Sequence, residues 1–476
     1  MSLDRRTFLI SSIAGAGMGG VGMVQSALSA GKTRAGNNAA KKMVTIRRRI
    51  PVRYEVDVFV AGGGPSGVAA SVAAARQGRS VFLAERQNCL GGMGTAGLLP
   101  VFMQFTDGVN FLAGGIGKEI QTKLQKAGGT GPDSDRTIKT EVLKRVYDAL
   151  LLDSGVRFTF ETRLIDVETR SDEVTLAILA AKSGIFAVKA KIFIDCTGDG
   201  DLAVWAGAPF KKGDKKGNLM AGTLCSIWAD VNWEQIKKSG YNQGKFLPQA
   251  FKDKVFTYED RHLPGMWRTG KNLGGGNIGH TFGVDGTDER SVTKALIWGR
   301  KLLTEYERYY KEYLKGYEKM ELVATGSALG IRETRRIMGD YVLNLGDFTK
   351  RAVFSDEIGR YSYPVDIHSA TPGDAGYQKY AEDFKKLRYG EGENYGIPYR
   401  VLIPRKLSNV LAAGRCVSTD RYMQSSIRVM PGCFITGQAA GVAAAIAVEK
   451  NTDTRGFAVS ELQRRLKKMG AFLPNC

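Results

Sequence analysis

The sequence has 476 residues, which is room for about two to four domains. Hydrophobic residues make up 43% and charged residues 24%, a globular composition that excludes a wholly disordered, collagen-like or disulfide-scaffold protein. The net charge of +20 raises nucleic acid or an anionic membrane as a partner. Residues 1–53, however, hold ten basic residues and one acidic residue, and no nucleic-acid-binding pattern follows them. We therefore expect no nucleic-acid partner.

Residues 1–30 have the pattern of an export signal. Arg5 and Arg6 stand before an apolar stretch with five glycines, which ends in small residues near Ala30. The segment resembles a twin-arginine signal peptide, which predicts cleavage near residue 30, a periplasmic location without a stable membrane anchor, and a cofactor bound before export. The alternative is a chance arginine pair on a retained anchor, which the glycines disfavour. Residues 31–50 predict a basic, solvated spacer.

A dinucleotide-binding motif follows the spacer. Residues 56–61 are a short apolar run typical of a buried parallel strand, and Gly62, Gly64 and Gly67 after it have the spacing G-x-G-x-x-G. In this motif Gly62 makes the tight turn, Gly64 admits a pyrophosphate and Gly67 lets the helix pack on the strand. Small residues continue the pattern into a helix whose N-terminus faces the phosphates. That helix begins with Pro65 and Ser66.

A second strand, residues 80–84, ends at Glu85. A carboxylate at this distance from the glycines accepts hydrogen bonds from a ribose diol, and the alternative is a solvated turn residue. Both NAD and FAD use this arrangement, and later segments favour FAD. They are a glycine loop at 91–92, a helix at 137–154, alternating strands at 157–167 and 174–190, a strand and nucleotide-contact turn at 191–201, a buried strand at 409–415 and a small-residue helix from Pro431.

Seven segments carry a family resemblance: VAGGGPSG, Glu85-Arg86, LGGMGTAG, IDCTGDGDLA, LGIRETRRIMGDYVL, IPYR and NVLAAGRCVSTDRYMQSSIRVMPGCFITGQAAGVAAA. Over residues 51–450 the chain resembles the FAD-dependent oxidoreductases whose flavin domain is related to that of heterodisulfide reductase. The resemblance implies an α/β protein with a glutathione-reductase-like FAD-binding Rossmann fold and an inserted α+β capping domain that binds the substrate. The implied division is FAD-binding segments at 51–225 and 395–450, a capping domain at 226–394, and a C-terminal helix and tail at 451–476.

The resemblance also assigns residues to non-covalently bound FAD. The dinucleotide motif, Glu85 and Arg86 would hold the AMP half and the pyrophosphate, and Gly92 and Thr95 would lie near the flavin. Gly198 and Asp199 would close a turn on the sheet side. The ribityl chain and the pyrimidine end of the flavin would be flanked by Gly414, Arg415, Gly437 and Ala440.

The cysteines show no metal or redox motif. Some relatives carry iron–sulfur clusters, but the six cysteines here include no C-x-x-C spacing. We expect no iron–sulfur cluster. Cys196, Cys225 and Cys433 are predicted to be buried and structural, while Cys89 and Cys416 fall near the flavin loops; the disulfide state stays open. The three histidines are scattered along the sequence, so we expect no metal site.

Flavin chemistry needs anion clamps and one acid or base from the capping domain. If residues 330–336 form a helix, Arg332 and Arg336 share a face and suit an oxyanion; the alternative is that Glu333 pairs with Arg336 and the rest contact FAD phosphates or carboxylates. His368, two residues after Asp366, is either a general base or a structural histidine.

Arg428 precedes the helix at the flavin end of the chain. It either stabilises negative charge on reduced flavin, binds substrate, or is structural.

Residues 274–280 are glycine-rich and predict a lid or a turn. Residues 291–317 predict an amphipathic helix whose tyrosines pack, and residues 459–469 predict a second amphipathic helix.

Three functions fit these features. The first is an FAD-dependent dehydrogenase or reductase that transfers hydride between a small polyhydroxy or anionic substrate and flavin N5, with an unidentified electron partner. The second is an NAD-dependent dehydrogenase, which the flavin-like segments disfavour. The third is a non-catalytic flavin-carrying subunit for electron transfer or binding.

Overall fold

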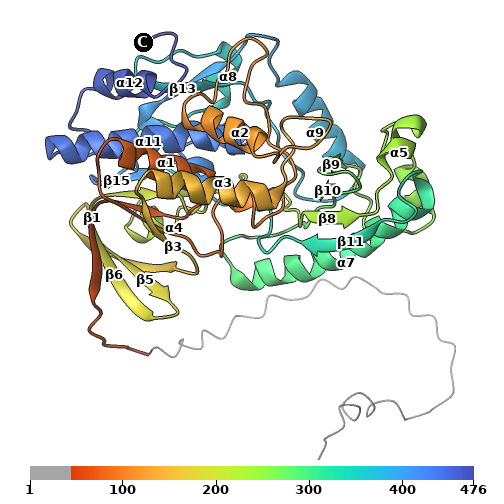
Figure 1. The fold of residues 1–476 in the computed structure, drawn as a ribbon, viewed down its shortest axis with the longest axis horizontal. Coiled ribbons are helices and arrows are strands. Elements are labelled where there is room, and N and C mark those ends of the chain that lie inside the picture. The colour runs from red at the N-terminus through yellow and green to blue at the C-terminus, as the bar shows by residue number, and fades with distance from the viewer. Residues whose placement is uncertain (1–43) are drawn as a thin grey trace, which may run out of the picture. The chain divides into compact units, whose positions relative to one another are not determined.

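A computed structural model describes residues 44–476 of the protein, so the predicted signal and most of the basic spacer lie outside the described residues. The chain separates into two units, Met1–Arg49 and Ile50–Cys476, and the described helices and strands all lie in the second. Its main feature is a seven-stranded sheet of order β3-β2-β1-β6-β5-β4, with β15 beside β6 (Figure 1). The strands are β1 (Val52–Ala61), β2 (Val81–Ala84), β3 (Arg157–Thr159), β4 (Arg163–Arg170), β5 (Glu173–Ala181), β6 (Gly184–Asp195) and β15 (Val410–Ala412).

The strands that carry the dinucleotide motif are parallel. β1 pairs in parallel with β2 and β6, and β15 continues the parallel order from the far end of the chain. β4 and β5 add an antiparallel hairpin. The single strand expected at 174–190 is therefore wrong, because the chain turns between Ala181 and Gly184. A long strand leaving that turn, β6, pairs with β5 through its first half and with β15 near its end.

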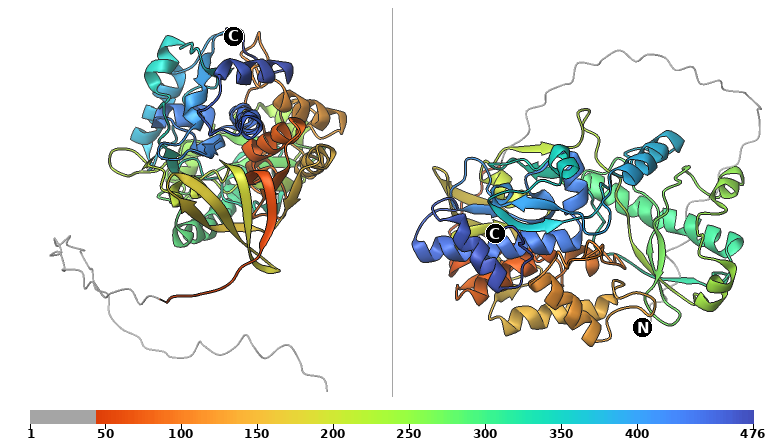
Figure 2. Two further views of the ribbon diagram at one scale, coloured as in Figure 1. Left: turned by 90° about the vertical axis from the view of Figure 1, so that its left-hand side faces the viewer. Right: turned by 90° about the horizontal axis from the view of Figure 1, so that it is seen from above.

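Helices cover one face of this sheet. Val58 and Val60 of β1 face α1 (Pro65–Arg76) and α11 (Met430–Lys450), whereas Phe59 faces the opposite layer formed with the β4–β5 hairpin. The left view of Figure 2 looks along α11, in blue, with α1 beside it. Further helices are α2 (Ile116–Lys126), α3 (Thr140–Asp153), α4 (Asp201–Trp205), α10 (Arg421–Ile427), α12 (Val459–Lys468) and the 3-10 turns Gly92–Gly94, Tyr399–Leu402 and Gly414–Cys416.

A second, antiparallel sheet has the order β11-β8-β10-β9. Its own hydrophobic cluster packs against α7, where Tyr306, Tyr309 and Tyr310 are buried, which confirms the packing expected of the tyrosines. The glycine-rich segment predicted as a lid or turn instead contributes strand β10 in the middle of this sheet. A Cβ on Gly275 would lie 2.3 Å from Pro100, so close packing accounts for the glycine. The elements are β8 (Ser226–Ala229), β9 (Gly265–Arg268), β10 (Gly274–Asn277), β11 (Glu321–Thr325), α5 (Trp233–Ser239), α6 (Leu247–Lys252) and α7 (Glu289–Tyr313).

Two small ribbons connect the sheets. The helix considered for residues 330–336 is wrong: the chain there is a loop that enters strand β12, which pairs with β7. Strand β13 ends at Tyr361, and residues 362–368 after it are irregular. The remaining elements are β7 (Phe210–Lys212), β12 (Arg335–Ile337), β13 (Glu357–Tyr361), β14 (Tyr395–Pro398), α8 (Leu345–Lys350) and α9 (Asp374–Lys386).

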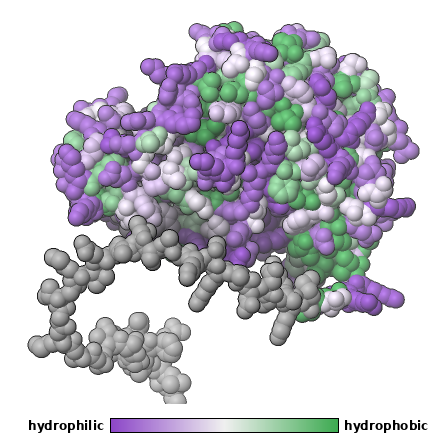
Figure 3. All heavy atoms as spheres, turned by 180° about the vertical axis from the view of Figure 1, so that it is seen from behind, coloured by the Kyte–Doolittle hydropathy of each residue, from purple (hydrophilic) through white to green (hydrophobic). Residues whose placement is uncertain are grey.

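Among the described residues, α11 alone is long and apolar enough to cross a membrane, yet it is completely buried inside the protein. It is the central helix of the core. The face seen in Figure 3 carries hydrophilic residues with small hydrophobic groups between them, as a water-exposed surface does.

The contact between α1 and α11 yields the first prediction. A Cβ on Gly437 would lie 2.2 Å from the backbone oxygen of Ser66, and both helices are held by the sheet. We expect Gly437→Ala to lower the free energy of unfolding by about 1–3 kcal/mol, the usual cost of overpacking. Denaturant unfolding measures it. Gly244→Ala is the control, because its nearest contact would be an ordinary 3.7 Å; equal stability of the two variants would contradict the prediction.

Candidate functional site

The turn after β1 has the geometry of a phosphate site. Gly62 has φ +94°, a conformation that favours glycine. Gly67 lies so close to the turn that a Cβ would be 1.9 Å from the Gly62 oxygen, so it serves helix packing. Gly64 differs from both: nothing lies within 4 Å of the position a Cβ would take. The N-terminus of α1 therefore opens onto free space beside Gly64, where an anion can approach the backbone.

A second loop lies against the same spot. The backbone N–H of Gly91 donates to the Gly63 oxygen at 2.8 Å. Gly92, with φ +52°, would place a Cβ 3.4 Å from the Cα of Gly64. Thr95 is buried, and its hydroxyl donates to the Leu90 oxygen, which fixes the loop.

Glu85 lies under the first turn and holds it. Its carboxylate accepts the N–H of Gly63 at 2.6 Å and that of Gln87 at 2.7 Å. The side chain is buried, and burial raises its pKa despite these hydrogen bonds. Arg86 is exposed beside it. The ribose contact assigned to Glu85 stays a prediction, and its visible role is to shape the glycine turn.

The residues from distant segments meet at the first turn of α1. Gly414 lies so close to Ser66 that a Cβ would be 2.5 Å from the hydroxyl oxygen, and Gly437 touches the Ser66 backbone. Asp199 accepts a hydrogen bond from Arg415 at 2.8 Å, with Gly198 directly over the guanidinium. The structure thus brings together nearly every residue that the resemblance assigned to FAD. Ala440 lies further along α11, fully buried.

Arg332 is a buried cation in the loop before β12. Its Nη1 donates to the Ala221 oxygen at 2.8 Å and to the Thr223 hydroxyl at 2.9 Å. Burial, and then the nearby charge of Arg428, lowers the pKa of Arg332 to about 10. Across residues 44–476 it makes no ion pair within 4.0 Å. The guanidinium is therefore charged at neutral pH without a directly bound carboxylate.

Arg336 is structural, as the alternative interpretation held. Glu333 is fully buried and pairs with both Arg336 and Arg421. The shared helical face for Arg332 and Arg336 is wrong, because the extended backbone of β12 separates the two side chains.

Arg428 reaches the same region as Arg332. It ends α10 and donates to Asp366, at 3.1 Å to the backbone oxygen and 3.3 Å to the carboxylate. Its buried Nε has no partner, and neither does the buried Oε1 of Gln424, whose amide holds the Arg332 backbone. Unpartnered buried polar atoms are costly in a folded protein unless something binds them.

The histidines, scattered in sequence, converge in space. Ring atoms of His262, His280 and His368, one from each, lie within 4.8 Å of one another. The premise that they are too scattered to form a site is wrong, because three loops that follow α6, β10 and β13 meet here. His368 Nε2 lies 3.3 Å from the Asp366 carboxylate, although the two residues lie in an irregular segment and not in a strand. Burial lowers the pKa values of His262 and His368 well below the ordinary range, and neighbouring positive groups add to this.

The sequence interpretation missed His262, His280 and Asp260. A local signal was present, because Asp260-Arg261-His262 repeats the D-x-H spacing of Asp366-Ile367-His368. Both pairs end in the same cluster.

All six cysteines are free, and five are buried, including Cys89 and Cys416. Burial raises the pKa values of these two thiols, which disfavours the reactive thiolate.

Comparison with known families decides the cofactor. The family model "FAD dependent oxidoreductase" matches residues 57–466. The chain belongs to this family. FAD is its cofactor, and the family supports a redox enzyme. No curated protein sequence matches the chain.

Solved structures of flavoenzymes resemble this FAD-dependent oxidoreductase at low identity. A geranylgeranyl bacteriochlorophyll reductase-like protein from Thermoplasma acidophilum shares 13% identity, with 88% of this chain and 84% of that chain covered and a TM-score of 0.44. The p-nitrophenol 4-monooxygenase of Pseudomonas putida shares 12%, covering 87% and 84%, with a TM-score of 0.43. A myxobacterial chondrochloren halogenase shares 12%, covering 87% and 79%, with a TM-score of 0.42.

The dinucleotide turn fits FAD. The open space at Gly64 is the point where a pyrophosphate approaches the motif, and the α1 N-terminus supplies N–H groups and partial positive charge there. Arg415 is held by Asp199. The unpartnered atoms of Arg428 and Gln424 lie in the region that Arg332 reaches.

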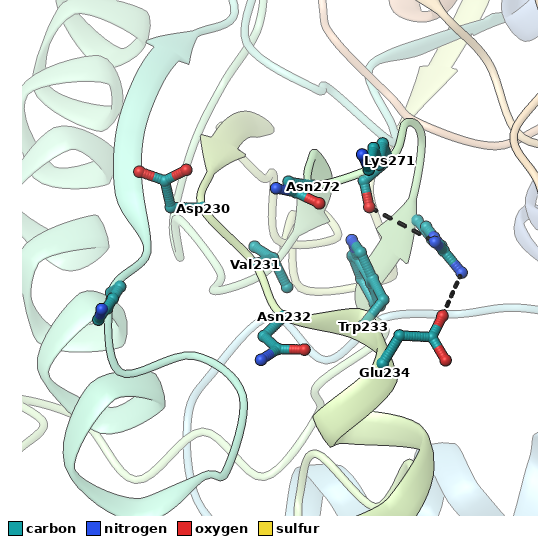
Figure 4. Close-up of a pocket in the computed structure, with 9 residues that line it drawn as sticks. Asp230, Val231, Asn232, Trp233, Glu234, Lys271 and Asn272 are labelled. Atoms are coloured by element: carbon teal, nitrogen blue, oxygen red, sulfur yellow. Dashed lines mark hydrogen bonds and ion pairs between the residues drawn. The ribbon is translucent and has the colours of Figure 1, made fainter.

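A hollow of about 570 Å³ lies elsewhere, beside the second sheet (Figure 4). Trp233 and Lys271 line it, and Arg268 bonds the Lys271 oxygen and pairs with Glu234. None of the predicted site residues lines this hollow. Its arginine is already paired, and its mouth is open to solvent.

The free space at Gly64 gives the second prediction. In Gly64→Ala the new methyl group meets no protein atom, and φ −65° suits alanine, so the fold is retained. The methyl group occupies the space of the pyrophosphate, and we expect FAD affinity to fall about tenfold or more. The flavin absorbance per chain and the midpoint of thermal unfolding measure both effects. Full FAD content would contradict the assignment, and Gly244→Ala is again the control.

Proposed function

We propose that this protein is an exported FAD-dependent oxidoreductase of glutathione-reductase-like fold that transfers hydride between a small anionic substrate and flavin N5. The proposal combines the family's cofactor with the charges of the buried site. When bound, FAD supplies the hydride chemistry. The protein has to hold the substrate, exclude water and manage one proton.

The observation that carries the substrate class is the buried charge of Arg332. Arg332 and Arg428 bring two positive charges to a region where Asp366 is the carboxylate bound to Arg428. An uncompensated buried cation is unfavourable, and an anionic ligand relieves it. Guanidinium groups bind carboxylates through paired hydrogen bonds, so a carboxylate or a similar oxyanion fits. A neutral sugar gives no such compensation.

The proton has a place in the same region. A substrate hydroxyl that loses hydride from its carbon also loses a proton from its oxygen. The histidine cluster is the nearest group of basic nitrogens to Arg332 and Arg428, since the charges of both arginines act on His368. We assign the histidine cluster to this proton, with His368 as the member beside Asp366.

The third prediction tests the anion clamp. We expect Arg332→Gln to slow anaerobic flavin reduction by a small hydroxy acid by about 100-fold, because a charge-assisted pair is lost. Reduction by a neutral polyol should be slow in both proteins. The flavin content and the unfolding midpoint show whether the variant is folded and loaded.

Arg290→Gln is the matched control, since Arg290 is exposed on α7. Arg332→Lys separates charge from geometry, because lysine keeps the charge and loses the two-pronged hydrogen bonding. If Arg332→Gln reacts with hydroxy acids as fast as the unaltered protein, the proposed substrate class is wrong.

The fourth prediction concerns export. We propose that Arg5 and Arg6 direct the folded, FAD-loaded chain across the membrane. Changing both to lysine should leave the precursor inside the cell, as measured by immunoblots of cell fractions. Lysine substitutions at Arg47 and Arg48 form the control. Unchanged export of the Arg5–Arg6 variant would contradict the twin-arginine route.

A further inference from the structure

The chain has three histidines, and all three form one buried cluster. They come from separate loops: His262 follows α6, His280 follows β10 and His368 follows β13. The His262 ring stacks on that of His368, with centroids 4.4 Å apart, and lies 5.1 Å from that of His280. The Tyr380 ring of α9 also packs on His262, with centroids 4.0 Å apart, and lies 5.6 Å from the ring of His368. The three rings and Tyr380 therefore form one packed aromatic group.

Two of the rings are each placed between the other ring and a carboxylate. His280 Nε2 lies 2.8 Å from His368 Nδ1. The outer nitrogens face acids: His280 Nδ1 is 2.8 Å from Asp260 Oδ2, and His368 Nε2 is 3.3 Å from Asp366 Oδ1. A carboxylate behind a histidine, with the other ring nitrogen turned inward, is the arrangement that proteins use to orient metal-binding imidazoles.

Counting protons shows that a cation is missing from this row. Three contacts need three protons, and two neutral imidazoles carry one N–H each. Whichever tautomers form, one contact sets two acceptors against each other. If both rings donate to their carboxylates, two lone pairs face each other across 2.8 Å. One cation between the rings removes the conflict.

The structure shows the unmet contact directly. His280 Nδ1 and Asp260 Oδ2 are buried, and despite their short separation their angles leave both without a hydrogen-bond partner. The His280 side chain is only 2% exposed. A metal ion on His280 Nε2 would place the ring proton on Nδ1, where the Asp260 carboxylate is near enough to accept it.

We propose that His262, His280 and His368 bind a divalent transition-metal ion of the zinc class, and that Asp260 and Asp366 orient two of the rings from behind. Three imidazole nitrogens suit zinc and its neighbours in the first transition row. Ligands about 2.1 Å from a tetrahedral ion lie about 3.4 Å apart. The separations here, from 2.8 Å to within 4.8 Å, lie on both sides of that value, so small ring rotations complete the site.

An open coordination position faces a narrow hollow. The hollow is lined by Asp260, His262 and His280 together with the loop at 369–373 and two tyrosines of α9. Its volume of about 10 Å³ is room for one water molecule or one ligand oxygen. Three protein ligands and one exchangeable oxygen are typical of catalytic rather than structural zinc.

The proposed metal adds one step to the proposed function, at the hydroxyl group of the substrate. If the substrate is a hydroxy anion, its hydroxyl oxygen is the ligand for the open position. Metal binding would then lower the pKa of that hydroxyl, so that its proton is released to water and the histidines act through the ion rather than by accepting the proton themselves. This step rests on the proposed function, whereas metal binding by the cluster does not. The two are therefore tested with different signals.

The experiment uses the full-length protein loaded with FAD. Metal is removed with a chelator, and Zn²⁺ or Co²⁺ is added back as the sole probe. We expect about one metal per chain by elemental analysis, and a Co²⁺ absorption band at longer wavelength than the flavin. Zinc should also raise the unfolding midpoint in proportion to the logarithm of its concentration.

Variants locate the ion. His280→Gln should lose most of the bound metal, and His262→Gln, at a less buried position, is the second ligand variant. Asp260→Asn should bind Co²⁺ about 10–100-fold more weakly, because the orienting carboxylate is lost. Glu382→Gln on the exposed side of α9 is the control.

Two results would overturn the proposal. The first is a protein that takes up no Zn²⁺ or Co²⁺ beyond the level of the His280→Gln variant, in which case a shared proton completes the row. The second is metal that is bound equally by all variants, which places it elsewhere. In either case an unchanged flavin spectrum shows that the FAD assignment stands, so the two failures are distinguishable.

Discussion

The close approach of α1 to α11 is the constraint on which the rest of the site depends. Ser66, in the first turn of α1, touches Gly437 in α11 and Gly414 in the turn after β15. A side chain at either glycine would push the C-terminal segment away from the dinucleotide motif. Because Gly414 and Gly437 have no side chain, residues more than three hundred positions apart in the sequence lie against the N-terminus of α1. The sheet alone could not achieve this, since β15 pairs with β6 through three residues only.

The same contact also positions the buried arginine and histidine region that we propose as the substrate site. α11 begins directly after Arg428, so its position against α1 also fixes the guanidinium that binds Asp366. Arg332 reaches this region from the loop before β12, and the histidines reach it from the second sheet and the loop after β13. The nucleotide turn is thus built from glycines and backbone, whereas the charged site is built from long side chains supplied by other layers. A protein can change the second without disturbing the first.

The sequence predicted the elements whose information is local. The glycine motif, the strand before it, the helix at 289–313 and the C-terminal helix carry their period and turn residues within one segment, and the structure has all four. Residues 332–336 and 274–277 were predicted wrongly because tertiary packing decided them. Arg336 is extended because β12 pairs with β7. Gly275 lies in a strand because β10 pairs with both β8 and β9, and close packing against Pro100 accounts for the glycine. The histidine cluster depends on three loops meeting, which spacing along the chain does not show. The repeated D-x-H spacing was the one local sequence signal of the histidine cluster.

Of the two buried arginines, Arg428 is paired with Asp366, whereas Arg332 has no carboxylate within ion-pair distance among the described residues. Asp366 is shared, since it contacts both Arg428 and His368. The proposed divalent ion would add two positive charges to this region and make it strongly attractive to an anion. An α-hydroxy carboxylate would meet both demands of the proposal, with its hydroxyl oxygen on the ion and its carboxylate on Arg332. Its carbon–hydrogen bond would then be fixed at two points, and such fixation is what hydride transfer to a flavin requires of a protein.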